Sequence, residues 1–431
     1  MIAGLKVKNA LLEVDELHSE QHSERHSERH SERHRIMNTH PLRLFLASGI
    51  GCMAALLVGC TDVPDDAGSP GDDRPNVILI MTDDQGYGDF GFTGNPVIRT
   101  PNLDALSEES VRLSPFYVSP VCAPTRASLM TGRYNYRTRV VDTWLGRAMM
   151  EPEEVTVAEV LRDGGYATGI FGKWHLGDNY PMRPRDQGFE EVLVHRGGGI
   201  GQPSDPPGGE GAYTDPILFH NGEEVRMEGY CTDIYFDEAM RWMDSAREEG
   251  RPFFAYVSTN APHGPYHDVP QELYDEYRAM DLSPARFPRD AGHPLPEEND
   301  PDRLARIFAM ITNIDDNVGR LMQYLERAGM ADNTLVLFLL DNGPNTRRYV
   351  AGLRGMKTEV YEGGIRSPFL ARWPGVLDPG AVEDRLAAHI DVMPTILDAA
   401  GMEPPADRAI DGRSLLPVLR RQEAAWGDRR L

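Results

Sequence analysis

Three continuous apolar runs along the chain each end in a short polar cluster. The runs are 77–81 (VILIM) before Thr82-Asp83-Asp84, 253–258 (FFAYVS) before Asn260-Ala261-Pro262-His263, and 334–340 (TLVLFLL) before Asp341-Asn342-Gly343. Runs of this length without polar alternation predict strands that are buried on both faces.

Apolar residues at helical spacing lie between the second and third runs. The clearest stretch covers 303–328, with Gly329 as its stop, and its apolar positions are Ile307, Met310, Ile311, Ile314, Val318, Leu321 and Leu325. Strands that alternate with helices predict an α/β fold, with a mostly parallel central sheet and helices on both faces. Because ligand sites in such sheets form at the carboxyl ends of strands, we expect the polar clusters to meet there.

Two of these clusters carry neighbouring oxygen ligands. Asp83 and Asp84 directly follow the first strand, and Asp341 and Asn342 follow the third. Adjacent carboxylates repel each other unless a proton or a cation intervenes. Four oxygen ligands without imidazole or thiolate favour a hard cation, Ca²⁺ or Mg²⁺. Each pair by itself is equally typical of a helix N-cap or a turn.

Cys122 lies in the segment Val-Cys-Ala-Pro-Thr-Arg. Pro124 is placed for the first turn of a helix, so Cys122 is expected at or near the N-cap, and Arg126 projects from the same face four residues later. A helix N-terminus beside a guanidinium is suited to bind an anion. A lone cysteine is more often a small buried apolar residue, but the flanking Pro and Arg favour a functional role.

The N-terminal residues do not read as part of the fold. Residues 1–36 are predicted to be a low-complexity extension, because a four-residue unit with histidine repeats through 18–34. Histidines at that spacing on one helix face could instead bind a metal. Residues 61–75 are acidic and rich in Pro, Gly and Asp, and we interpret them as a disordered tether.

Residues 37–60 predict a lipoprotein signal peptide. Arg43 precedes an apolar stretch that is too short for a stable membrane span, and the residues before Cys60 (Leu-Val-Gly) resemble a bacterial lipobox. We therefore expect cleavage before Cys60 and lipidation of its thiol. The protein would then be periplasmic or at the cell surface, attached to a membrane by lipid.

The charge and cysteine content of the chain limit the binding partners and the disulfides that we expect. The chain has 431 residues, enough for one large domain or two, and its 67 acidic and 44 basic residues give a net charge of −23. This charge argues against a nucleic-acid partner, although a local cationic pocket can still attract an anionic substrate. Beyond the signal segment only Cys122 and Cys231 remain. We interpret Cys231 as a buried free thiol, with a disulfide to Cys122 as the alternative.

Taken together, the motifs resemble the formylglycine-dependent sulfatases of the alkaline phosphatase superfamily, in their arylsulfatase-like, bacterial lipoprotein form. The signature is Cys122-x-Pro124-x-Arg126 followed by Leu129 and Thr131-Gly132-Arg133, with Thr125 where the family usually has Ser. Further matches, in family order, are Asp83-Asp84-Gln85-Gly86-Tyr87-Gly88-Asp89, Gly172-Lys173-Trp174-His175-Leu176-Gly177, Ala261-Pro262-His263, Asp341-Asn342-Gly343 and Gly355-Met356-Lys357. The resemblance covers about residues 75–418.

The resemblance implies a sulfuric ester hydrolase that releases inorganic sulfate from an aryl sulfate or a sulfated carbohydrate. Cys122 would be oxidised to formylglycine by a maturation enzyme and would hold Ca²⁺, or alternatively Mg²⁺, together with Asp83, Asp84, Asp341 and Asn342. The implied polar set of the active site is Arg126, Lys173, His175, His263 and Lys357. For an isolated Lys or His, a surface lysine or a hydrogen-bonded core histidine is the alternative interpretation.

The same resemblance suggests individual roles. The hydrated aldehyde would supply two hydroxyls, of which one attacks sulfur and the other later expels sulfate. Asp341 would help to activate the attacking hydroxyl and Arg126 would orient the diol. Lys173 and Lys357 would bind the sulfate group. His175 would be the base for the second hydroxyl, and His263, with or without Lys357, would protonate the leaving oxygen.

The spacing of Lys173 and His175 predicts the directions of their side chains. If the chain stays extended after the strand, Lys173 and His175 point to one face and towards the same oxyanion. The glycine-rich segment 197–213 is interpreted as a flexible loop at the pocket rim. His195, Arg196 and His267 are weaker candidates on the substrate side.

The domain boundaries follow from these motifs. We expect a catalytic domain over 76–420 and, over 421–431, the start of a C-terminal antiparallel subdomain that is largely missing. The main alternative function is a phosphonate monoester or phosphodiester hydrolase of the same superfamily. A lipid-anchored binding protein without catalysis is the third hypothesis.

Overall fold

The computed structural model describes residues 74–431 apart from 145, 203, 210, 289–291, 423–425 and 428. The predicted extension and signal peptide lie outside the described residues, as does the predicted tether up to residue 73. The described residues fall within one unit, Ala67–Leu431.

Eleven strands form a single sheet in the described part of the chain. Their bounds are β1 Asn76–Thr82, β2 Val111–Tyr117, β3 Ala167–Lys173, β4 Glu191–His195, β5 Ile217–His220, β6 Glu223–Arg226, β7 Phe253–Ser258, β8 Thr334–Leu340, β9 Arg366–Arg372, β10 Val382–Glu383 and β11 Ala387–Ala388. The order across the sheet is β10-β2-β9-β8-β1-β7-β3-β4-β5-β6, and β11 pairs with β2.

The helices follow the expected alternation with strands. The α-helices are α2 Pro101–Glu108, α3 Cys122–Thr131, α4 Val157–Asp163, α5 Cys231–Glu248, α6 Gln271–Arg278, α7 Pro301–Arg327, α8 Glu362–Ile365, α9 Val392–Ala399 and α10 Leu416–Leu419. The short 3₁₀ helices are η1 Gly91–Thr93, η2 Pro184–Gln187, η3 Pro284–Arg286, η4 Ala331–Asn333 and η5 His389–Asp391. The predicted helix 303–328 is thus confirmed as α7, and Gly329 follows it with a φ of 66°.

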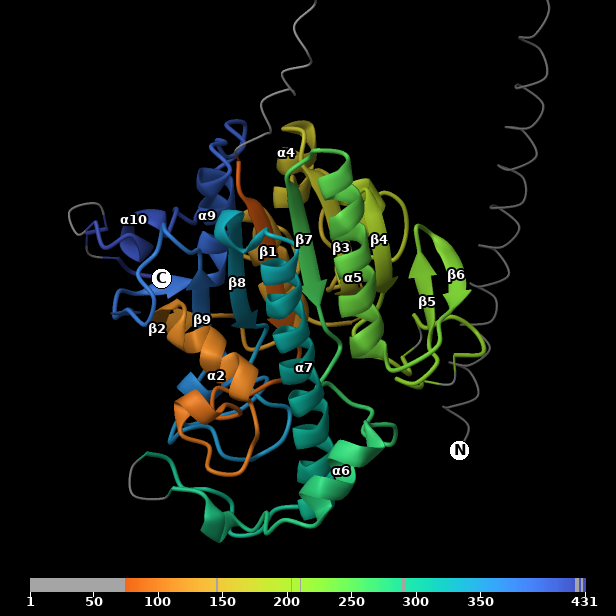
Figure 1. Ribbon diagram of the computed structural model, residues 1–431, viewed down its shortest axis with the longest axis vertical. Helices are drawn as coiled ribbons and strands as arrows, with labels where there is room; N and C mark the ends of the chain where they lie inside the picture. The colour runs from red at the N-terminus through yellow and green to blue at the C-terminus, as the bar shows by residue number, and fades with distance from the viewer. Residues whose placement is uncertain are drawn as a thin grey trace, which may run out of the picture. The chain divides into compact units, whose positions relative to one another are not determined.

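The central strands are buried on both faces, as their apolar runs predict. Val77, Leu79 and Met81 of β1 belong to the apolar cluster that includes residues of α3, α4 and α9. Ile78 and Ile80, which point to the opposite face, belong to the cluster that includes residues of α2, α5 and α7. Figure 1 shows α5 and α7 lying in front of the sheet. Helices on both faces of a mixed, mostly parallel sheet confirm the predicted fold class.

The centre of the sheet brings four strand ends together. Strands β8, β1, β7 and β3 are neighbours in this order, and each adjacent pair is parallel. Their carboxyl ends therefore lie along one edge. The residues at or just after these ends are Asp341, Asp83, Ser258 and Lys173. Although these residues are far apart in the sequence, the strand order makes them neighbours.

Antiparallel pairs flank this centre, which the sequence did not reveal. β9 runs antiparallel to both β8 and β2, and β5 runs antiparallel to β4 and β6. A parallel return would require a crossover, usually a helix packed on the sheet face. The chain instead runs along the candidate-site edge from residue 341 to 365, with only the four-residue α8, and re-enters as β9. This route keeps Lys357 at the same edge as the strand ends.

The last described residues pack on the same core. Trp426 is buried in the apolar cluster that contains α9, and Nη1 of Arg429 donates to Oδ2 of Asp391 at 2.5 Å. A separate subdomain beginning at residue 421 stays a prediction. No helix among the described residues is long and apolar enough to span a bilayer.

Candidate active site

The N-terminus of α3 delivers Cys122 to the strand ends. Val121 is the N-cap with extended backbone (φ −146°, ψ 155°), so Cys122 is the first helical residue and lies near the N-cap, as predicted. The Sγ atom of Cys122 and one carboxylate oxygen each of Asp83 and Asp341 all lie within 4.8 Å of one another. All three residues are buried. The structure therefore groups the cysteine with the two acids that the sequence placed at strand ends.

Arg126 joins three strand ends from beneath this group. Its Nη2 donates to Oδ2 of Asp341 at 2.8 Å, and its Nη1 donates to Oγ of Ser258 at 2.5 Å and to the carbonyl of Lys173 at 3.1 Å. The Arg126 side chain is only 1% exposed. Because a guanidinium presents several donors in a fixed plane, it holds these ends in register.

Three buried oxygen atoms in the acidic group lack a hydrogen-bond partner among the described residues. They are Oδ1 of Asp83, Oδ2 of Asp84 and Oδ1 of Asn342. Nδ2 of Asn342 donates to Oδ1 of Asp84 at 2.8 Å, which turns the amide oxygen away from that carboxylate. A buried acceptor without a donor is costly, and such oxygens are the ligands that Ca²⁺ and Mg²⁺ prefer. The donor set therefore fits a hard divalent cation.

The protonation of the two central acids points to the same conclusion. Burial raises the pKa of Asp83, but the charges of Lys173, His263 and Arg126 outweigh it and hold that pKa well below its usual range. Burial and the charge of Asp83 raise the pKa of Asp341 well above its usual range, despite Arg126. Two carboxylates that share a buried site resist double ionisation. A bound divalent cation would let both ionise.

The two predicted lysines occupy different places. Nζ of Lys173 bonds to Oδ2 of Asp83, and the lysine side chain is fully buried. Nζ of Lys357 lies 2.5 Å from Oδ1 of Asp84, and this side chain is 11% exposed. Lys357 lines the pocket described below, whereas Lys173 does not. A bound anion would therefore reach Lys357 first.

His175 does not follow the geometry expected from its spacing. Strand β3 ends at Lys173, and His175 has a φ of 61°, so the segment is not extended and the expectation of one shared face was wrong. Gly172, with a φ of 125°, starts this turn, and a Cβ there would lie 1.8 Å from the carbonyl oxygen of Ser258. Close packing of β3 against β7 thus requires glycine and bends the chain.

The turn gives His175 a defined tautomer. Its Nε2 lies 2.7 Å from the carbonyl oxygen of Thr143, which can only accept, so Nε2 carries the proton. Its Nδ1 is buried and has no hydrogen-bond partner among the described residues. Burial, reinforced by the charge of Lys173, lowers the pKa of His175 well below its usual value. His175 is therefore neutral, with a free lone pair on Nδ1.

His263 has the opposite arrangement. Its Nδ1 donates to the carbonyl of Gly264 at 2.7 Å, and its Nε2 lies 3.6 Å from Oδ2 of Asp84. Any second proton on this ring would therefore sit on Nε2, beside a carboxylate. The two histidines thus offer one nitrogen each: an acceptor on His175 and a possible donor on His263.

A pocket of about 730 Å³ opens above these groups. Cys122, His175, His263 and Lys357 line its base. The predicted rim loop is present: Gly197, Gly198, Gln202 and Ser204 form part of the wall. A Cβ at Gly199 would lie 2.7 Å from Cε1 of His263, so this loop packs directly on the base of the pocket.

Left-handed backbone occurs at three non-glycine residues of the site. Asp84 has a φ of 63°, His175 of 61° and Thr358, beside Lys357, of 74°. Such conformations are unfavourable for residues with a Cβ and persist where the surroundings enforce them. Two of them are candidate residues and the third is next to one, which marks this edge of the sheet as the functional one.

The weaker substrate-side candidates lie outside the pocket lining. His195 pairs with Asp205, and the Arg196 guanidinium stacks 3.4 Å from the centre of the Phe219 ring. His267 is exposed on the loop that follows His263.

Three participants were missed by the sequence analysis. Ser258 could have been found, because it is the last residue of a predicted strand and bonds to Arg126. Thr143 and Trp144, which also line the pocket, belong to a loop without a recognisable pattern. Only the folded chain brings that loop to His175.

The remaining sequence features have structural explanations. Oγ1 of Thr125 accepts a hydrogen bond from the amide of Ser119 at 2.9 Å, which fixes the segment that leads into Cys122. Cys231 is a buried free thiol, as expected, and no disulfide joins it to Cys122. Burial raises the pKa of Cys231 to about 12, which makes it unreactive.

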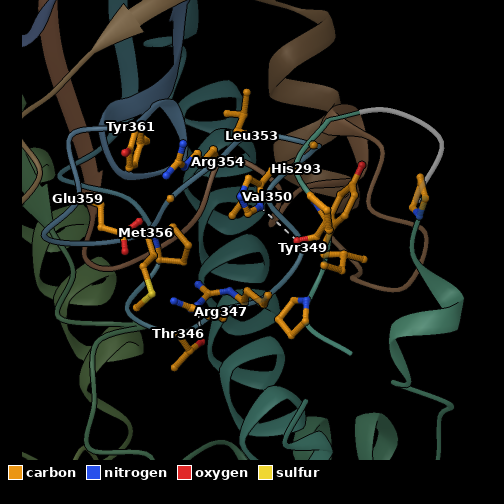
Figure 2. Close-up of a pocket in the computed structure, with 18 residues that line it drawn as sticks. His293, Thr346, Arg347, Tyr349, Val350, Leu353, Arg354, Met356, Glu359 and Tyr361 are labelled. Atoms are coloured by element: carbon orange, nitrogen blue, oxygen red, sulfur yellow. Dashed lines mark hydrogen bonds between the residues drawn. The ribbon is translucent and has the colours of Figure 1, made fainter. Parts of the chain in front are cut away.

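A second cavity, of about 300 Å³, is lined by residues close to Lys357 in the sequence, among them Met356 and Glu359. Figure 2 shows Arg354 beside Tyr361, with Arg347 and Thr346 along the opposite wall. The Arg354 guanidinium lies 3.7 Å from the centre of the Tyr361 ring. None of the four residues at the base of the larger pocket lines this cavity. The candidate chemistry therefore belongs to the larger pocket.

Known proteins are similar to this chain over most of its described residues. The family model described as Sulfatase matches residues 75–402. The chain is 31% identical over 382 residues to N-acetylgalactosamine-6-sulfatase of Mus musculus, covering 82% of this chain and 67% of that protein. It is 34% identical over 378 residues to arylsulfatase A of Homo sapiens, covering 80% of this chain and 68% of that protein. The chain thus spans about two thirds of the length of these curated relatives.

A solved structure shows the same architecture. The crystal structure of Ps i-CgsB in complex with k-i-k-neocarrahexaose matches with a TM-score of 0.70 and 29% sequence identity, covering 81% of this chain and 77% of that chain. The matched part contains a fold of the kind described here, with a mostly parallel sheet between helices.

Proposed function

The chain belongs to the sulfatase family, whose members hydrolyse sulfate esters, and from this premise we propose that position 122 is its nucleophile, in the form of formylglycine. The substrate would be a sulfated carbohydrate or an aryl sulfate, the classes named in N-acetylgalactosamine-6-sulfatase and arylsulfatase A. One observation carries the proposal: Sγ of Cys122 lies at the base of an open pocket, grouped with carboxylate oxygens of Asp83 and Asp341.

A divalent cation completes the proposed site. Asp83, Asp84, Asp341 and Asn342 would hold Ca²⁺, with Mg²⁺ as the alternative, together with position 122. When bound, such a cation polarises an oxygen nucleophile and stabilises negative charge.

Charge balance supports an anionic substrate. Fully ionised, the three acids Asp83, Asp84 and Asp341 carry −3, and the three cations Arg126, Lys173 and Lys357 carry +3. A divalent cation would leave the group at +2. A sulfate ester carries one negative charge, so it would enter a site with excess positive charge despite the acidic protein.

The chain's own residues divide the remaining tasks. Lys357 at the pocket wall would bind the sulfate oxygens, and Lys173 would fix Asp83 from below. Nδ1 of His175 would accept a proton from the hydroxyl that later expels sulfate. Nε2 of His263 would donate to the leaving oxygen. Proton transfer by positioned groups of this kind typically contributes about 10²–10⁴-fold to the rate.

Mass spectrometry and sulfate release test the proposal together. The peptide that contains Cys122 is analysed after expression with a formylglycine-generating enzyme, and sulfate release from 4-nitrophenyl sulfate and from sulfated sugars is measured on the same sample. We expect the aldehyde form and release of inorganic sulfate, and a Cys122→Ala variant should show neither. Full conversion to formylglycine without hydrolysis of any sulfate ester would contradict the proposal.

Membrane attachment is a second part of the proposal. The residues before Cys60 resemble a lipobox, and this segment precedes the described residues. Lipidation of Cys60 after cleavage would place the enzyme in the periplasm or at the cell surface.

A further inference from the structure

The lining of the larger pocket combines two kinds of side chain besides the groups at its base. Trp144, Ala148 and Met149 are apolar, and Asp178 and Gln202 are polar. The base holds the groups assigned to the sulfate ester. The walls therefore face the alcohol part of the substrate.

Trp144 is exposed, yet its loop is held in place. Trp144 is 64% exposed, more than any other apolar residue that lines the pocket. The amide of Val141 donates to the carbonyl of Arg147 at 3.0 Å, and the amide of Arg147 donates to the carbonyl of Trp144 at 3.1 Å. Thr143, next to Trp144, accepts the hydrogen bond from His175. The residue before Trp144 is thus hydrogen-bonded to His175, a candidate catalytic residue.

Exposure of the apolar indole of Trp144 to water is unfavourable in free energy. Large apolar side chains that gather on a surface commonly mark a binding site. Val141, Trp144 and Met149 are all exposed large apolar residues of this one loop. An indole offers a flat apolar face, against which the C–H face of a pyranose ring can pack.

The polar side chains of the lining have unused hydrogen-bonding groups, and the carboxylate of Asp178 also interacts electrostatically with Arg196. Across the described residues, the side chains of Asp178, Asn179 and Gln202 form no hydrogen bond or ion pair, and all three line the pocket. A carboxylate accepts hydrogen bonds and an amide both donates and accepts. Hydroxyl groups of a sugar match such a wall, whereas an aryl or other apolar alcohol would remove these groups from water without replacing their hydrogen bonds.

We propose that the loop around Trp144 and the polar wall with Asp178 and Gln202 form a pyranose-binding subsite, which makes a sulfated sugar the substrate of the site. This inference rests on the proposed sulfatase function and adds the identity of the alcohol. Trp144 packs on the sugar ring and positions the ester over position 122. Asp178, Asn179 and Gln202 bind hydroxyl groups of the sugar.

Steady-state kinetics with matched variants test the subsite. The probes are a panel of monosulfated monosaccharides and 4-nitrophenyl sulfate, on enzyme with verified formylglycine. For the best sugar of the panel, Trp144→Ala should raise KM by at least ~10-fold with a smaller effect on kcat, and Trp144→Phe should recover most of the loss. Asp178→Ala should lower the sugar-to-aryl ratio of kcat/KM by at least ~10-fold, because only the sugar offers hydroxyls.

Tyr136 provides the matched control. It is an exposed aromatic residue, at 78%, in the preceding loop and does not line the pocket, so Tyr136→Ala should leave the kinetics as in the wild type. An unchanged KM for every sugar in Trp144→Ala would overturn the subsite, as would an Asp178→Ala variant with an unchanged ratio. Loss of binding to another macromolecule in Trp144→Ala, with normal turnover, would also overturn it. Failure of the wild type on all sulfate esters would instead refute the proposed function.

Discussion

Nη2 of Arg126 lies 2.8 Å from Oδ2 of Asp341, although 215 residues separate them in the chain. Arg126 comes from α3 and Asp341 follows β8, so one ion pair connects the helix that begins at Cys122 to the centre of the sheet. Both side chains are withdrawn from water, at 1% and 0% exposure. Because the remaining guanidinium donors reach Ser258 and Lys173, the pair also fixes the ends of β7 and β3.

Removing this guanidinium should destabilise the protein strongly. In Arg126→Met, the buried carboxylate of Asp341 loses its charged partner, and we expect the free energy of unfolding to fall by about 3–5 kcal/mol. The matched control is Arg241→Met, which breaks the exposed pair with Glu238 and should cost at most about 1 kcal/mol. Urea unfolding of both variants measures the difference. Equal losses would show that Arg126 does not organise the strand ends.

Asp341 should be required for both the metal and turnover. Asp341→Asn keeps the shape of the side chain but removes one negative charge from the proposed cation site, so Ca²⁺ content should fall and kcat should drop by at least ~100-fold. Elemental analysis after gel filtration measures the first effect. Asp315→Asn is the control, because that buried carboxylate bonds to amides of α2 instead. Wild-type metal content in Asp341→Asn would refute the assignment.

The enzyme should hydrolyse sulfate esters more efficiently than phosphorus esters. An aryl sulfate and the matched phosphonate monoester or phosphodiester each carry one negative charge, so charge alone cannot select among them. This chain retains the whole block 172–177, including Lys173 and His175. We expect kcat/KM for the aryl sulfate to exceed that for either phosphorus ester by at least ~10-fold, about 1.4 kcal/mol of transition-state discrimination. A phosphorus ester that is hydrolysed faster by the same formylglycine-positive sample would reverse the assignment.

Membrane attachment should depend on one cysteine. Cys60→Ala removes the thiol that lipidation requires, so the protein should move from the membrane fraction to the soluble fraction. Cys52→Ala alters the other cysteine of the same segment and should leave fractionation unchanged. Fractionation and immunoblotting of both variants in a bacterial host measure this. A membrane-bound Cys60→Ala protein would exclude the lipobox interpretation.

Buried His389 should make stability depend on pH. Burial lowers its pKa to about 4, and its Nδ1 donates to the carbonyl of Tyr117 at 3.0 Å. Between pH 6.5 and 4 the unfolded chain therefore binds a proton that the folded chain does not. The stability is full above pH 6.5 and falls as the pH drops towards 4, by about 3 kcal/mol for this group.

A neutral substitution should remove this part of the pH dependence. His389→Asn retains a donor for the Tyr117 carbonyl but does not titrate, so its free energy of unfolding should fall less between pH 7 and pH 4.5 than that of the wild type. His267→Asn, at an exposed histidine, should keep the wild-type slope. Urea unfolding at the two pH values gives both slopes. Identical slopes for His389→Asn and the wild type would contradict the assignment.

Much of the architecture could be read from local patterns. The three apolar runs became β1, β7 and β8, and the helical spacing became α7, because burial of a strand or a helix face imposes a period that survives in the sequence. Since parallel strands place their carboxyl ends at one edge, the clusters at 83–84, 260–263 and 341–342 were also expected to meet. The antiparallel flanks were not expected, because their short strands carry no comparable run.

The sequence by itself determined which chemical groups this protein brings to its site: Cys122, the acids after the strands, and the ordered set of Lys and His residues. Only the tertiary structure decided how they are used. The strand order β8-β1-β7-β3 made Asp341, Asp83 and Lys173 neighbours, and it buried Lys173 against Asp83 while leaving Lys357 at the pocket. Such pairings depend on contacts between residues far apart in the chain, and a local pattern carries no information about which distant partner will neutralise a buried charge.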